Sequence, residues 1–148
     1  ELVNIYYNDI EFVTEGVKIL IKRSKTDQSG EGSVKAIPYF DNQEFCPVVA
    51  LKNYVNKKFS NTNEGKIFNI SDKSVALIIK RYAEKAGLDS SKYAGHSLRS
   101  GFATTAAEFG AEERNIMAMT GHKTTQMVRR YIQEANLFKN NALNKIKI

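Results

Sequence analysis

Three residue types that suit phosphate chemistry follow one another in the second half of the chain. His96 and Arg99 lie three residues apart, His122 follows Arg99 by 23 residues, and Tyr131 follows His122 by nine. An arginine can hold two phosphate oxygens at once, and a histidine can donate to a third. A tyrosine phenol, with a pKa of about 10, becomes a good nucleophile only where positive charge stabilises the phenolate. The set therefore indicates attack by Tyr131 on a phosphate held by cations.

Each of these residues, taken alone, has an ordinary explanation. His96 and Arg99 would share one face of a helix start, where they could cap the helix or lie at the surface. The pair Gly121-His122 is typical of a helix end closed by glycine. Tyr131 by itself is typical of a core aromatic residue. Only their order and spacing together favour the interpretation in terms of phosphate chemistry.

This order and spacing resemble the tyrosine recombinases, the family of phage integrases and Xer-type resolvases. The segment HSLRSGFATTAAEFGAEERNIMAMTGH, residues 96–122, is similar to the family's block of a histidine–arginine helix, a small-residue helix and glycine–histidine. The resemblance covers essentially the whole chain. It implies that Tyr131 attacks a DNA phosphate and forms a 3′-phosphotyrosyl link. It also implies that Arg99 and His122 hold the non-bridging oxygens, and that His96 assists in proton handling at the nucleophile.

The resemblance also implies a lysine on a loop between two strands. The segment Arg23-Ser24-Lys25-Thr26 falls at the matching place, so Lys25 is the expected general acid for the leaving 5′ oxygen. Lys22 and Lys35 are nearby alternatives. Neither a cofactor nor a metal is expected, because the chain has two histidines, one cysteine and no HExxH or CxxC motif.

The elements that must position these residues are a few strands followed by helices. Alternating and apolar runs bounded by turn residues predict strands over 10–13, 16–21 and 34–38, with a long basic loop between the last two. Helical spacing of apolar residues, with caps, predicts helices over 47–59, 72–87, 96–109, 111–119 and 124–135, and one last short helix in the tail from Leu137. Residues 2–7 could be the end of a helix. We therefore expect a mostly helical α+β fold, the tyrosine-recombinase catalytic-domain fold, with a small three-stranded antiparallel sheet at one edge.

The start of the chain suggests a fragment. It begins Glu1-Leu2, which is similar to the end of an Arg-x-x-Glu-Leu element that carries another catalytic arginine in the family. We expect residues 1–148 to be a single catalytic domain that lacks this arginine and the family's N-terminal DNA-clamping domain. Such a domain would fold correctly but be weak or silent alone.

Composition agrees with a DNA-binding protein. The 148 residues carry a net charge of +6 with a pI of about 9.4, and 42% of them are hydrophobic. A basic, foldable chain suits a polyanionic partner. A single cysteine favours a reducing cytoplasm, and no apolar run is long enough to span a membrane. The resemblance implies double-stranded DNA and other protomers as partners, assembled as a tetramer on synapsed sites, and leaves open an accessory DNA-bending protein.

Several alternatives remain open from the sequence. A type IB topoisomerase uses similar residues in the same order, and a decayed mobile element could leave a DNA-binding module without catalysis. The third alternative is a helical protein-interaction domain in which the motifs are accidental. In the tail, an apolar face could pack on its own domain or dock onto a neighbouring protomer, and its residues are Leu137, Phe138, Leu143 and Ile146.

Overall fold

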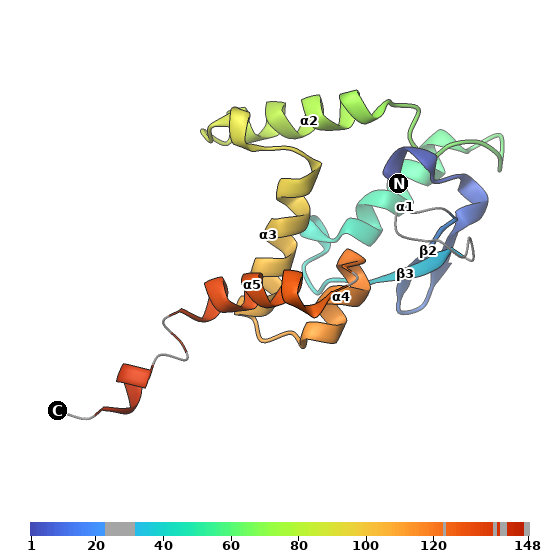
Figure 1. Ribbon diagram of the computed structural model, residues 1–148. Coiled ribbons are helices and arrows are strands. Elements are labelled where there is room, and N and C mark those ends of the chain that lie inside the picture. The colour runs from blue at the N-terminus through green and yellow to red at the C-terminus, as the bar shows by residue number, and fades with distance from the viewer. Residues whose placement is uncertain (23–31, 123, 138, 140–141, 147–148) are drawn as a thin grey trace. The chain divides into compact units, whose positions relative to one another are not determined.

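The computed structural model describes residues 1–22, 32–122, 124–137, 139 and 142–146 (Figure 1). The chain divides into two compact units, residues 1–72 and 73–148. The organisation of the chain as a single catalytic domain remains a prediction.

The first unit is built on an antiparallel sheet with the strand order β1-β2-β3. The strands are Ile10–Val13 (β1), Gly16–Ile21 (β2) and Ser33–Pro38 (β3). The middle strand pairs with both neighbours, and its residue Val17 is almost fully buried. The predicted sheet is confirmed, with the third strand beginning one residue earlier than expected. Most of the predicted basic loop, residues 23–31, lies outside the described residues.

Helix α1, Pro47–Lys58, packs against this sheet. Its first residue is the proline, whose fixed φ angle suits a first helical turn and whose missing N–H is not needed there. Val48 and Val55 are the residues of this helix that are buried. The chain before the sheet forms 3-10 turns, Leu2–Asn4 and Tyr7–Asp9, and not the end of an α-helix.

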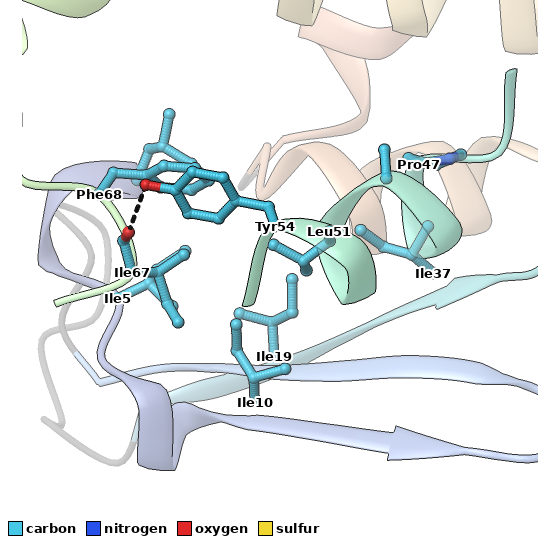
Figure 2. A pocket seen from close by; sticks show the side chains of 11 residues that line it. Ile5, Ile10, Ile19, Ile37, Pro47, Leu51, Tyr54, Ile67 and Phe68 are labelled. Carbon is cyan, nitrogen blue, oxygen red and sulfur yellow. Dashed lines mark hydrogen bonds between the residues drawn. The ribbon is translucent and has the colours of Figure 1, made fainter. Parts of the chain in front are cut away.

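An apolar cavity of about 470 Å³ lies within this unit (Figure 2). The hydroxyl of Tyr54, one of the lining residues, donates to the carbonyl oxygen of Ile67 at 3.1 Å. The cavity offers hydrocarbon surface but no acid, base or cation for chemistry. Its lining consists of Leu2, Ile5, Ile10, Ile19, Ile37, Pro47, Ala50, Leu51, Tyr54, Ile67 and Phe68.

The second unit is helical. Its helices are α2, Asp72–Lys85, which begins at the last residue of the first unit, then α3, Gly95–Glu108, α4, Glu113–Thr120, and α5, Thr125–Asn136. The last three pack on one another around a buried cluster of Ala103, Ala107, Ile116 and Val128. The two alanines, one turn apart on α3, leave room for close helix packing. The expected mostly helical α+β fold with a small three-stranded antiparallel sheet is confirmed.

Helix α4 begins two residues later than the sequence predicts, because Ala111 belongs to the end of α3. Gly110 has a left-handed backbone with φ of +82°, and its N–H donates to Ala107 O at 3.0 Å. The N–H of Ala111 reaches back to Ala106 O at 2.9 Å. These two bonds form a Schellman motif, in which the residue after the glycine still satisfies the preceding helix.

The tail forms a 3-10 turn, Ala142–Lys145, where a short helix is predicted. Leu137, Leu143 and Ile146 are exposed, and Phe138 lies outside the described residues. Each of the three described side chains is more than half exposed, so together they bury little apolar surface. Across the described part of the chain, no helix has the length and apolar character needed to cross a membrane.

Candidate active site

His96 and Arg99 are positioned by the first turn of α3. The helix start is capped by Ser97, whose Oγ accepts from the N–H of Ala94 at 3.0 Å and donates to Lys92 O at 3.1 Å. The cap fixes the first turn because it satisfies a backbone group that the helix leaves unpaired. His96 is exposed and Arg99 is half-buried. His96 and Arg99 therefore both lie on a helix turn that the cap holds in place.

The Arg99 guanidinium lies against Gly121, in the turn between α4 and α5. This glycine ends α4 in the left-handed region with φ of +70°, and its N–H donates to Met117 O at 2.7 Å. A Cβ added here would lie 3.2 Å from Nη2 of Arg99, which is closer than ordinary contact. The position therefore favours glycine for its backbone angle and for the approach of the arginine.

His122 follows this turn and lies beside Tyr131. The two ring centroids are 5.9 Å apart with an angle of 42° between the ring planes. Burial of the imidazole lowers its pKa from the ordinary value of 6.5, and the positive charges of Arg99 and His96 lower it further. His96 and Arg99 therefore lie within electrostatic reach of this ring.

Tyr131 lies on α5 with its ring against the buried cluster of the second unit. The ring is half-buried, and Val128, three residues earlier on the same helix, is fully buried. The phenol oxygen lies 3.2 Å from Oγ of Ser100 on α3. This hydrogen bond holds the hydroxyl end of the ring toward the helix that carries His96 and Arg99.

The sequence reasoning missed two residues of this site. Ser100 lies four residues after His96, so helical periodicity alone places both on one face, and this spacing could have identified it. Thr120 lies two residues before His122, and its Oγ1 is 2.7 Å from Nδ1 of that ring. No pattern in the sequence distinguishes this threonine from an ordinary helix residue.

The structure brings together His96, Arg99, His122 and Tyr131, all within the second unit. Lys25 lies outside the described residues, so its position is not described.

The two alternative lysines belong to the first unit. Lys22 Nζ lies 2.6 Å from Oδ1 of the buried Asp9, so the two side chains form an ion pair. Lys35 is on β3, opposite Ile19 of β2.

The four residues of the second unit offer one phenol, two imidazoles and one guanidinium. This set of side chains can bind an anion, because the guanidinium and a protonated imidazole both donate charge-assisted hydrogen bonds. The same cations would lower the cost of forming a phenolate. The arrangement can therefore hold a phosphate next to a tyrosine hydroxyl.

The chain is similar to known proteins over most of its length. The sequence profile of the phage integrase family matches residues 1–137. A curated protein from Selenomonas ruminantium, described as an integrase/recombinase xerD homolog, is 46% identical over 158 aligned positions. The alignment covers 99% of this chain and 46% of that protein, so the chain spans about half the length of the relative. No solved structure gives a significant match.

Proposed function

Because the chain belongs to the phage integrase family, we propose that it is the catalytic domain of a site-specific DNA recombinase. It would cleave and rejoin DNA strands through a 3′-phosphotyrosyl intermediate. The observation that carries this proposal is a chain of contacts, in which Arg99 lies against Gly121 and the next residue, His122, lies beside Tyr131.

In the proposed cleavage step, the phenol oxygen of Tyr131 forms a bond to phosphorus. The bond from phosphorus to the 5′ oxygen breaks, so the products are a 3′-phosphotyrosyl ester and a 5′-hydroxyl. His96, in its neutral form, would accept the phenol proton, and Lys25 would supply a proton to the leaving oxygen. The ester conserves the energy of the broken bond, so a hydroxyl of another strand can reverse the step without a further energy source.

Arg99 and His122 would hold the two non-bridging oxygens of the phosphate during this step. Negative charge builds on these oxygens as phosphorus becomes five-coordinate, and donors fixed in advance stabilise that charge without rearranging. The cap of α3 and the turn at Gly121 provide such fixed positions. Ser100 would orient the phenol for attack through its 3.2 Å contact.

Among the lysines, the contacts of the first unit support Lys25 over Lys22. Lys22 is the charge partner of Asp9, a carboxylate that is 4% exposed. Moving this ammonium to a DNA strand would leave a buried carboxylate without its partner, which is costly. Lys35 remains an alternative because it lies on the strand that follows the loop.

The proposed partners are double-stranded DNA and other copies of the protein, which would form a tetramer on paired sites. Strand exchange between two duplexes requires more than one active tyrosine, whereas a type IB topoisomerase needs only one. Joined products between two differently labelled duplexes would therefore support recombination. Relaxation of supercoiled plasmid without joined products would support the topoisomerase.

The central experiment looks for the covalent intermediate. We would mix the chain, and a version lengthened at its N-terminus to include the expected arginine, with nicked duplexes drawn from the DNA that flanks the gene. The nick releases a short strand after cleavage and so traps the protein on the DNA. Denaturing gels and mass spectrometry would identify the adduct and the modified residue.

The matched variants are Tyr131→Phe and Tyr82→Phe. Tyr82 is an exposed tyrosine on α2 in the same unit. We expect the adduct in the wild-type protein and in Tyr82→Phe, and its complete loss in Tyr131→Phe. Specific DNA binding without any adduct would instead support a binding module that has lost catalysis.

A further inference from the structure

Thr120 is a buried polar residue at the end of α4. The residue as a whole is only 4% exposed to solvent. The hydroxyl oxygen lies 2.7 Å from the carbonyl oxygen of Ile116 and 2.7 Å from Nδ1 of His122. One hydroxyl therefore connects the backbone of the helix to the imidazole of the candidate active site.

The two contacts of this hydroxyl determine where the imidazole proton lies. A threonine hydroxyl has a single hydrogen, and a carbonyl oxygen can only accept. The hydrogen of Thr120 must therefore point at Ile116 O, because otherwise two oxygens would face each other at 2.7 Å with no hydrogen between them. The hydroxyl then has only lone pairs to offer to Nδ1 of His122. The ring must donate there, and its Nδ1 carries a hydrogen.

A neutral imidazole carries one hydrogen, so a hydrogen on Nδ1 leaves Nε2 with a lone pair. A lone pair repels a phosphate oxygen. Nε2 can donate to phosphate only when the ring gains a second proton and becomes an imidazolium.

We propose that Thr120 is a positioning residue that keeps the His122 proton on Nδ1, so that His122 binds a DNA phosphate oxygen through Nε2 only as an imidazolium. The inference rests on the proposed function and adds a proton that the protein must take up when the phosphate binds. Without DNA, burial and the neighbouring charges of Arg99 and His96 keep the pKa of His122 low. Among the described residues, the contacts of the ring on α4 and α5 are Thr120 and Tyr131, and neither carries a negative charge while the phenol is protonated. The phosphate anion would supply the missing negative charge.

Nitrogen-15 NMR of the imidazole rings tests the proton position directly. The chain has only two histidines, so His96→Asn assigns both sets of signals. At a pH where His122 is neutral, we expect a pyrrole-like signal from Nδ1 and a pyridine-like signal from Nε2. The reverse pattern in the DNA-free wild-type protein would overturn the proposal, and no substitution of Thr120 is needed for this measurement.

Two substitutions of Thr120 provide matched controls. Thr120→Val has nearly the same shape and lacks the hydroxyl, whereas Thr120→Ser keeps it. We expect the Nε2–H form to become populated in the valine variant and the wild-type pattern to return in the serine variant. Equal tautomer populations in the wild-type and valine proteins, both folded by circular dichroism, would show that Thr120 does not hold the ring.

The same NMR signals, recorded with duplex DNA bound to Tyr131→Phe, test the role of the imidazolium. We expect both ring nitrogens to carry a proton in the complex. A His122 ring that stays neutral in the DNA complex would overturn the claim that it binds phosphate as an imidazolium.

Adduct formation should slow by about tenfold in Thr120→Val and recover in Thr120→Ser. This is the lower end of the effect seen when a metal-ligating histidine loses the group that orients its ring. Unchanged adduct formation in the valine variant would contradict the positioning role. An absent adduct in every protein would instead count against the proposed function, while the tautomer measured without DNA would still decide the role of Thr120.

Discussion

The hydroxyl of Tyr131 has a defined partner before any DNA is present. Ser100 Oγ lies 3.2 Å from it, and the ring itself packs on the buried cluster of α3, α4 and α5. In the proposed cleavage step, a phenol held at both its ring and its hydroxyl would have fewer orientations to lose, which would lower the entropic cost of attack.

A double-mutant cycle measures the bond between Ser100 and Tyr131. Ser100→Ala and Tyr131→Phe should each lower the free energy of unfolding by about 0.5–1.5 kcal/mol, since each removes one partner of a half-buried hydrogen bond. The double variant should cost little more than either single variant, because the bond is already lost. Urea unfolding followed by circular dichroism gives the three values. Fully additive costs would mean that the two hydroxyls do not interact.

His122 should make stability depend on pH. Its pKa is lower in the folded protein than the ordinary value of 6.5, so between these two values the unfolded chain binds more protons than the folded one. The free energy of unfolding should therefore fall as the pH falls from about 7 through this range. Thermal unfolding of the wild type and His122→Gln at several pH values would isolate the effect. An identical pH dependence of stability in both proteins would show that His122 does not cause this effect.

At the scale of elements, the glycines at the ends of helices α3 and α4 determine how the site is built. Gly110 and Gly121 both adopt left-handed angles, and each ends one helix so that the next can turn back. Gly101 is different, because it lies inside α3 with open space around the place where a Cβ would be. The same substitution should therefore have opposite effects at different glycines.

We predict that Gly101→Ala stabilises the protein and Gly110→Ala destabilises it. Alanine inside a helix is favoured over glycine by roughly 0.5–1 kcal/mol, whereas a left-handed alanine costs about 1–2 kcal/mol. Apart from the adjacent residues and the helix's own backbone, no atom of the described residues lies within 4 Å of the added Cβ at either position, so backbone conformation decides the sign. Chemical denaturation of the two variants tests this, and a change of the same sign in both would contradict the assigned backbone angles.

At the scale of the whole molecule, the excess of positive charge should dominate encounters with DNA. The chain carries 22 lysines and arginines against 16 acidic residues. Each phosphate neutralised by such a cation releases a counterion, so affinity falls as salt increases.

Binding of the chain to duplex DNA should weaken by about tenfold or more between 50 and 200 mM salt, which corresponds to about two or more phosphate contacts. Arg99→Gln should reduce the slope of log affinity against log salt by about one, because one contact is removed. Fluorescence anisotropy with a labelled duplex measures both. An affinity that does not change with salt would show that binding does not depend on the phosphates.

The sequence by itself determined much of the local structure. Strand β2 and helix α1 were predicted with nearly the observed bounds, because apolar periodicity and a proline at a helix start act over a few residues. The spacing of His96, Arg99, His122 and Tyr131 indicated the family, and the match to the phage integrase family confirms it. Their roles and that of Lys25 remain predictions.

Only the tertiary structure decided which side chains meet. The bond between Ser100 and Tyr131 joins residues 31 positions apart, and the approach of Arg99 to Gly121 depends on how α3 packs against α4. Helical periodicity specifies which face of a helix a residue occupies, but packing between helices decides what that face contacts.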